Sequence, residues 1–537
     1  MIPSVIALAA LTGPLPKLGV VVAAGLVAMT LLVESKRARA SAMLGALMLA
    51  PVLLLADIWH SPQLRTVHRH PLFGLVAALL ALAVVVAIAI AISKRPTLIA
   101  PLVVLAVPFR VPIQAGGSTS NLLVPLYVVV AAGALAFIVP ALREDEGPAA
   151  APLPRPSRRD EAARAREAAA APSKPRARVS TWIERLLALY VVLYAVQSVY
   201  SPDFEKALQQ MVFFYVPFAL MFVLLRRVEW DRRLIRRCME LVVVLSVLFA
   251  FIGFVEYATK TIILNPRLVV ANDLHTYFTV NSVFFDPDIF GRFLALVMVL
   301  LAAVLLYNRR QRDQLMAIGV LAVLWVGLLL TLSRSSLGAL LVGLATLAAL
   351  RWRVSRAVVV AVAVVAIGAV AVAVSPKTFG LNQGLNGASS GRAGLVSGGI
   401  DMFKARPLWG YGSGAFVTEY RRRHPHSSTT LAASHTIAIT IAAEQGLIGE
   451  LAYIALVLVA LVVLIRGARD DPPRAAIAAA FFALVFHTLL YADFLEDPVA
   501  WLLLGIGTAL AAMPRSARQS PGTTTPSRAG VASGATA

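Results

Sequence analysis

The sequence contains a single cysteine, Cys238, in 537 residues, and only 14% of its residues are charged. One cysteine excludes an intrachain disulfide and any zinc cluster built from cysteines. Such sparse charge, beside 59% hydrophobic residues and a mean hydropathy of +0.79, excludes a soluble globular enzyme and a disordered chain. The composition is that of a protein whose solvent is lipid.

The charges that are present are mostly positive, with 49 Lys+Arg against 28 Asp+Glu and a formal net charge of +21. A nucleic-acid-binding protein is disfavoured, because the basic residues lie in short clusters between apolar runs. Clusters placed this way mark the cytoplasmic loops of multi-pass membrane proteins. They lie at 36–39, 94–95, 226–227, 232–237, 309–310, 351–356 and 466–474. The loops between these clusters are expected to face outward. Two further basic clusters, 65–70 and 421–423, lie in such outward-facing loops and are exceptions to the pattern.

The apolar runs predict an all-α fold, a polytopic transmembrane helical bundle of about 12–16 spans, because a spanning helix needs about 20 apolar residues. Several runs are short, so some spans are expected to be tilted or to be half-helices. The runs lie near 18–33, 41–56, 71–92, 97–108, 121–141, 182–199, 211–225, 239–257, 288–307, 315–332, 336–350, 357–374, 446–465, 475–491 and 498–513.

Placing the basic clusters in the cytoplasm defines the domain organisation. Two segments, rich in Ala/Pro/Arg and in Ser/Thr/Gly/Pro, cannot bury a core and are expected to be disordered. We predict N-terminal spans at 1–142, a disordered cytoplasmic linker at 143–180, central spans at 181–374, a long extracytoplasmic loop at 375–445, C-terminal spans at 446–513 and a disordered tail at 514–537.

The first polar motif is FFDPDIFGRFL at 284–294. Pro287 suits the first position of a helix, with Asp286 as its N-cap. Asp288 and Arg292 are four residues apart, so they share a helix face and can form an ion pair. The alternative is that Arg292 points into a cavity at the outer surface.

The second motif is LTLSRSSL at 330–337, a polar stretch between two apolar runs. If these runs are antiparallel helices, Arg334 lies at the outer membrane interface. Its side chain then either extends to the headgroups or binds an anion.

The long loop contains an amphipathic stretch at 393–404, followed by PLWGYGSGAF at 407–416. The proline and three alternating glycines end any helix and permit tight turns. No strand precedes the glycines, so this is not a nucleotide-binding loop. The cluster Arg421, Arg422 and Arg423 either binds anionic lipid headgroups or a charged glycan, or crosses with a long loop regardless of charge.

His435 stands where the long loop returns to the membrane, a position that can adjust its pKa for acid–base chemistry. A zinc site formed with His424 and His426 is disfavoured, because the spacing supplies no further ligand. No metal or cofactor is therefore predicted. The acidic residues Asp493, Glu496 and Asp497 either position a base and bind sugar hydroxyls, or form a solvated turn.

Together these motifs resemble the O-antigen ligase family of polytopic membrane glycan ligases and polymerases. The resemblance covers about 280–465, and its pieces stand in family order. They are FFDPDIFGRFL, LTLSRSSL, the Gly391-Arg392 pair with PLWGYGSGAF, and Ser434-His-Thr followed by AEQGLIG at 443–449.

The resemblance implies a fold related to the lipid-dependent glycosyltransferases of the cell envelope. It also implies a glycan donor carried on undecaprenyl or another polyprenyl diphosphate, a glycan, lipid or wall acceptor, and chemistry at the outer face of the plasma (inner) membrane. By motif, the diphosphate-binding arginine is Arg392 and the catalytic histidine is His435, with Arg334 in support. The arginine usual just upstream of the FDP motif is missing at 277–281, so either Arg292 or Arg267 substitutes for it or the activity differs from that of the family. The family's His-Asn pair reads His435-Thr436 here.

An outward arginine and a neutral histidine suit metal-independent glycosyl transfer. Arginine stabilises the charge on a leaving diphosphate, and histidine accepts the proton of an acceptor hydroxyl. A small-anion transporter, for example of bicarbonate, is the alternative, and it requires charged residues within spans, for which Arg292 and His487 are the best candidates. A flippase or assembly subunit is the third possibility, and it would make His435 dispensable.

Overall fold

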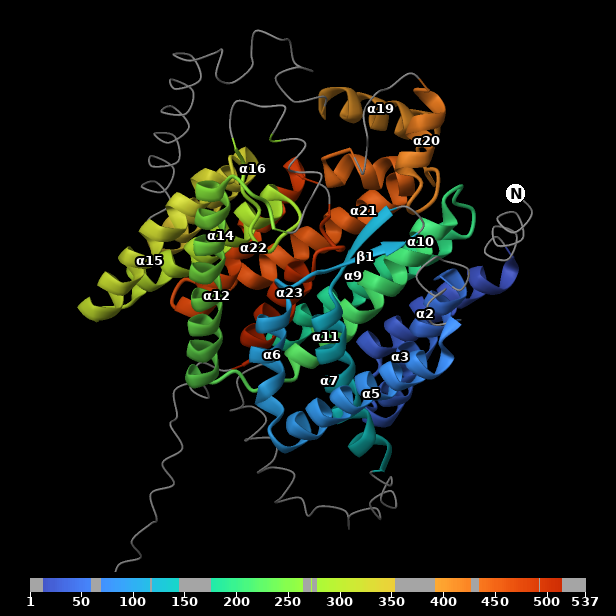
Figure 1. Ribbon diagram of the computed structural model, residues 1–537, viewed down its shortest axis with the longest axis horizontal. Helices are drawn as coiled ribbons and strands as arrows, with labels where there is room; N and C mark the ends of the chain where they lie inside the picture. The colour runs from blue at the N-terminus through green and yellow to red at the C-terminus, as the bar shows by residue number, and fades with distance from the viewer. Residues whose placement is uncertain are drawn as a thin grey trace, which may run out of the picture.

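The structure is a computed structural model that describes residues 13–58, 69–115, 118–143, 175–263, 272, 278–352, 392–425, 434–491 and 493–513. Among these residues nearly every element is a helix, and the helices form one bundle (Figure 1). The predicted all-α, polytopic fold is confirmed. The described part of the chain also contains one short antiparallel hairpin, β1 (Val111–Ala115) and β2 (Ser118–Leu122).

Eleven described helical segments are long and apolar enough to cross a membrane. They are α2 (Pro14–Leu32), α3 (Lys36–Ile58), α5 (Pro71–Lys94), α7 (Val124–Arg143), the continuous α10 (Phe204–Gln210), η2 (Met211–Tyr215) and α11 (Val216–Arg226), α12 (Arg232–Thr259), α14 (Pro287–Tyr307), α15 (Gln311–Leu330), α16 (Arg334–Arg351), α21 (Ile437–Ile465) and α22 (Pro472–Leu490).

Shorter apolar helices complete the bundle. They are η1 (Pro96–Leu98) with α6 (Ile99–Ala106), and α23 (Pro498–Ala512). A further long helix, α9 (Pro175–Ser198), packs against α2 and α21. It begins within the segment predicted as a linker. The rest of that linker, the predicted span at 357–374 and the C-terminal tail lie outside the described residues.

The burial of the helices fits a lipid solvent. In α14 67% of the spanning window is buried, whereas in α5 only 11% is, although α5 has the higher hydropathy. Leu72 and Leu80 on α5 are 77% and 64% exposed. An apolar surface of this extent is unstable in water and natural in a bilayer. α14 is one of the interior helices, because it packs against α15, α16 and α22.

The helix ends gather on two opposite sides of the bundle. On one side, the Val280 N–H before α14 donates to the Leu330 carbonyl at the end of α15 (3.4 Å). On the other, the Tyr307 hydroxyl at the end of α14 donates to the Arg469 carbonyl (3.5 Å) between α21 and α22. The second side carries the basic clusters around 309–310 and 466–474, and we call it the basic end. The loops that precede and follow α14 thus lie at opposite ends of the bundle.

Two helices, α19 (Arg392–Ala405) and α20 (Phe416–Arg423), lie beside α21 at the end opposite the basic end (Figure 1). As predicted, the helix at 393–404 ends at the glycine-rich motif. Gly410 has φ +66°, and a Cβ there would overlap the Glu444 carbonyl. The Glu444 carboxylate accepts hydrogen bonds from the backbone N–H groups of Gly414 (2.8 Å) and Phe416 (2.9 Å). These contacts fasten the loop to α21 and fix the position of α19.

Candidate functional site

The N-termini of three helices meet at the end of the bundle opposite the basic end. Asp286 caps α14, where its carboxylate accepts from the Asp288 N–H (2.7 Å), and Pro287 is the first helical residue, both as predicted. Ser333 caps α16 by accepting from the Ser336 N–H (3.2 Å). α19 begins at Arg392. Because each N-terminus carries a partial positive charge, their meeting creates a region suited to anions.

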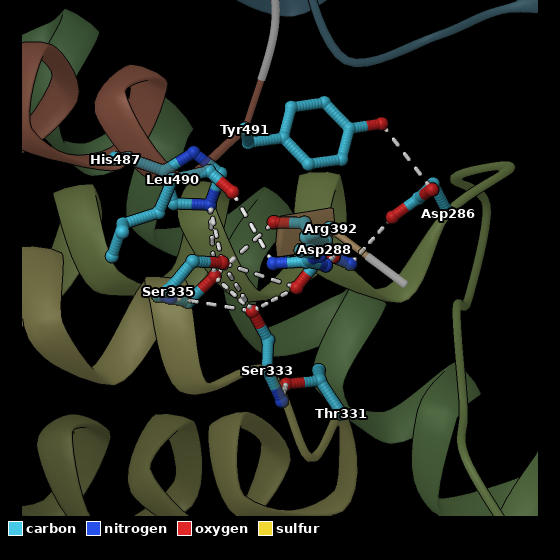
Figure 2. A network of polar contacts seen from close by, with 10 residues as sticks. Asp286, Asp288, Thr331, Ser333, Ser335, Arg392, His487, Leu490 and Tyr491 are labelled. Atoms are coloured by element: carbon cyan, nitrogen blue, oxygen red, sulfur yellow. Dashed lines mark hydrogen bonds and ion pairs between the residues drawn. The ribbon is translucent and has the colours of Figure 1, made fainter. Parts of the chain in front are cut away.

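Asp288 joins these three helices (Figure 2). Its carboxylate lies 3.5 Å from the Arg392 guanidinium and accepts hydrogen bonds from the hydroxyls of Ser335 (3.1 Å) and Ser333. The predicted pair between Asp288 and Arg292 is therefore wrong. A shared helix face makes a pair between Asp288 and Arg292 possible, but the partner of Asp288 is Arg392 on α19.

Arg392 is held in place while part of its side chain stays open. Its guanidinium donates to the Leu490 carbonyl at the end of α22 (3.2 Å), and its side chain is 38% exposed. A cation at a helix N-terminus is disfavoured by the helix dipole, so the two acceptors offset an unfavourable position. The result is an accessible guanidinium that reinforces the positive end of α19.

His487 is the buried part of the same network. It is fully buried on α22, and its Nε2 lies 3.2 Å from the Ser335 hydroxyl and 3.3 Å from that of Ser336. Its Nδ1 is buried and has no hydrogen-bond partner among the described residues. In the sequence His487 stands out only as a charge within a span. Its link to Arg392 through Ser335 and Asp288 was missed.

His435 lies beside this network. It has a left-handed backbone (φ +58°), which is uncommon for a residue other than glycine, and the buried Ser434 holds the turn by accepting from the Thr436 N–H (3.1 Å). The imidazole is half-buried. Burial lowers its pKa and the Arg392 charge lowers it further, while Asp288 and Asp493 act in the opposite direction. The ring is therefore neutral near pH 7 and able to accept a proton.

Tyr491 connects the two histidines. Its ring centroid lies 6.2 Å from that of His435 and 5.6 Å from that of His487. Its hydroxyl donates to the Asp286 carboxylate (3.2 Å) (Figure 2). Burial raises the pKa of Asp286 to about 6, and the neighbouring Asp288 charge adds to this. No motif in the sequence pointed to Tyr491.

Arg292 is buried rather than open to a cavity. Its residue is 3% exposed and its guanidinium pairs with Asp497 at 2.5 Å. Asp497 also caps α23 by accepting from the Val499 N–H (2.9 Å). A solvated turn is therefore the wrong interpretation of Asp497, and also of Glu496, which accepts a hydrogen bond from Gln210. The guanidinium carbon of Arg292 lies 5.9 Å from the centroid of the Tyr491 ring, so Arg292 is buried beside the accessible part of the site.

The remaining predicted residues are more peripheral. Arg334 is exposed at the first position of α16, between the two serines that contact Asp288. Arg421 is exposed on α20, and Arg267 lies outside the described residues. The His424 ring stacks on Tyr420 (4.4 Å between centroids). His426 lies outside the described residues, and in the rest of the described chain no three His, Cys, Asp or Glu residues group as metal ligands.

Comparison with known proteins bears on part of this site. Residues 317–454 match the family model of O-antigen ligase, which confirms the resemblance drawn from the motifs. The matched segment includes α16, Arg392 and His435. No curated protein matches the chain significantly.

Proposed function

We propose that this chain, whose residues 317–454 match the family model of O-antigen ligase, is a membrane glycosyltransferase of that type. It transfers or polymerises a glycan carried on a polyprenyl diphosphate at the outer face of the plasma membrane. One observation carries the proposal. An accessible arginine and a neutral histidine, Arg392 and His435, lie together where the N-termini of α14, α16 and α19 meet.

In this proposal Arg392 binds the diphosphate of the donor. The planar guanidinium matches phosphate oxygens, and the surrounding helix N-termini add partial positive charge. Asp288 occupies one side of the guanidinium, at 3.5 Å, and thereby sets its orientation. Because the diphosphate gains negative charge as it leaves, groups fixed in this way stabilise the transition state more than the bound donor.

His435 is the proposed base. It takes the proton of the acceptor hydroxyl while the hydroxyl oxygen bonds to the anomeric carbon of the donor sugar. The bond from that carbon to the diphosphate breaks, and the prenyl diphosphate leaves with the electron pair. This single displacement inverts the anomeric carbon and needs no metal, because Arg392 and the helix N-termini neutralise the leaving group. Tyr491 contacts the His435 ring and limits its orientation.

The exposed arginines Arg334 and Arg421 are proposed to contact the glycan or its carrier around this centre. Arg292, which is buried against Asp497, is proposed to support the site from behind. The site lies opposite the basic end, and loops rich in Lys and Arg face the cytoplasm. This supports an outward-facing site, supplied by a donor that the membrane delivers.

The test is the pair of variants His435→Ala and Arg392→Ala, produced in cells that lack the native copy. Each is expected to abolish glycan polymer or its attachment while leaving the amount of protein in the membrane unchanged. Arg422→Gln is the matched control, since Arg422 is an exposed arginine of the same loop that pairs with Glu419 (3.4 Å). Unchanged polymer length and attachment in both variants would contradict the proposal. Uptake of a small anion into proteoliposomes without any lipid-linked sugar would support the transporter instead.

A further inference from the structure

A second cavity system lies away from the catalytic site. An apolar cavity of about 440 Å³ runs between α6, α12, α14, α22 and α23. Along α14 its lining extends from Phe293, next to Arg292, to Asn308 just after the helix. With a rise of 1.5 Å per residue this is about 22 Å, most of the thickness of a hydrocarbon core. The cavity has the dimensions of a site for a lipid chain.

This apolar cavity continues into a second, more polar one at the basic end. The second cavity, of about 610 Å³, shares Ile235, Met239 and Asn308 with the first. Its lining includes three arginines, Arg232, Arg236 and Arg310. We call the two together the lipid groove. The first, apolar cavity is the trough of this groove, and the second cavity, which carries the guanidinium groups, is its mouth.

The charges at the mouth are not all paired. Three carboxylates also line it: Glu240, Asp313 and Asp471. Glu240 pairs with Arg236 (2.7 Å), Asp313 accepts from the Asn308 amide (2.7 Å), and Asp471 is buried.

Arg232 and Arg310 are exposed, and neither forms an ion pair with another residue in the described parts of the chain. Two cations are therefore available to a ligand above an apolar trough.

We propose that the lipid groove binds an anionic glycerophospholipid of the leaflet at the basic end, with an acyl chain in the trough and the phosphate near Arg232 and Arg310. Basic pockets between transmembrane helices bind anionic headgroups in this manner. The donor of the proposed reaction is a different lipid. α14 separates Asp288 from Asn308 by about 30 Å, so a headgroup at the mouth cannot reach Arg392. The bound lipid fills the trough, which lies between the catalytic site and the basic end, and holds α12 against α14.

The experiment measures retained lipid on the full-length protein by native mass spectrometry. The delipidated protein is offered phosphatidylglycerol or phosphatidylcholine with identical acyl chains. We expect preferential retention of phosphatidylglycerol. The variant Arg232→Gln/Arg310→Gln should lower its affinity by about fivefold for each arginine removed. Retention should also fall sharply for phosphatidylglycerol with six-carbon chains, which tests the trough without altering the protein.

The matched control is Arg233→Gln/Arg309→Gln. It removes the same charge from the sequence neighbours of the two arginines, and neither neighbour lines the cavities. This control should retain phosphatidylglycerol within about twofold of the unaltered protein, a smaller loss than the test pair.

Equal retention of both phospholipids, or an equal loss in the test and control pairs, would overturn the proposal. So would displacement of phosphatidylglycerol by a polyprenyl phosphate, which would assign the trough to the donor. All variants leave Arg392 and His435 intact, so failure here is distinct from failure of the proposed reaction.

Discussion

The Asp288 carboxylate lies 3.5 Å from the Arg392 guanidinium, and this contact joins the first turn of α14 to the first residue of α19. Asp288 also accepts hydrogen bonds from serines of α16, so one carboxylate fixes three helix N-termini relative to one another. The arrangement makes Asp288 a positioning residue for the proposed phosphate-binding arginine.

Replacing Asp288 by asparagine should therefore lower activity without removing either proposed catalytic group. Asp288→Asn keeps the size of the side chain and a hydrogen-bond acceptor for the serines, but it removes the charge that orients Arg392. We expect kcat/KM for glycan transfer to fall at least tenfold, or about 1.4 kcal/mol of transition-state stabilisation, mainly through kcat. Steady-state kinetics with purified lipid-linked donor measure both constants.

A carboxylate elsewhere on α19 provides the control for Asp288. Asp401 lies 3.9 Å from Lys404, and both are exposed. Asp401→Asn should leave the kinetics unchanged, because an exposed pair of this kind contributes little. A fall in kcat/KM as large as that of Asp288→Asn would show a general effect of charge on α19 rather than orientation of Arg392.

The pH dependence of activity should report the ionisation of His435. Burial and the Arg392 charge both lower the pKa of His435, so the base is neutral at pH 7 and is lost only in more acidic solution. Removing the arginine charge raises this pKa. Arg392→Gln should therefore shift the acidic limb of the residual pH–rate profile to higher pH, whereas Arg392→Lys should leave it nearly in place. Superimposable limbs in the two variants would mean that the limb belongs to another group.

Hydropathy and capping chemistry were sufficient to predict most of the helices and one of the helix starts. The described spanning helices follow the apolar runs, Asp286 caps α14 as its sequence predicts, and α19 ends where the glycine motif begins, whereas the polar helix α20 was not predicted. These features depend on residues within a few positions of one another, so a sequence displays them directly.

The partners of charged groups were not predictable in the same way. Arg292 stood four residues from Asp288, yet it pairs with Asp497 on α23, while Asp288 pairs with Arg392. The i,i+4 rule identifies which residues can meet on one helix, but burial and the approach of distant segments decide which pair forms. The contacts of Tyr491 and His487 were not predictable for the same reason. Their contacts come from α14, α16 and the turn before α21, none of which adjoins them in sequence.

The Arg292–Asp497 pair should matter for stability. Removing one member of a buried ion pair leaves an uncompensated charge and costs about 3–5 kcal/mol. Arg292→Met should therefore lower the thermal denaturation midpoint of the detergent-solubilised protein clearly, and Arg292→Met/Asp497→Asn should recover part of the loss. Arg422→Gln removes an exposed arginine, and the buried Glu419 keeps its second pair with Arg423 (3.0 Å), so this change should cost about 1 kcal/mol or less. Equal shifts for Arg292→Met and Arg422→Gln would contradict the burial of the first pair.

The attachment of the glycine-rich loop to α21 should be as necessary to activity as the residues of the site. Gly410→Ala places a side chain on a left-handed backbone, which costs about 1–2 kcal/mol, and its Cβ would overlap the Glu444 carbonyl. We expect the loop to detach from α21, α19 to move and activity to fall strongly, with new protease cleavage between α19 and α20. Gly319→Ala on α15 is the control, because a Cβ there meets no atom within 4 Å and alanine favours a helix. Full activity in Gly410→Ala would show that Arg392 is positioned without this loop.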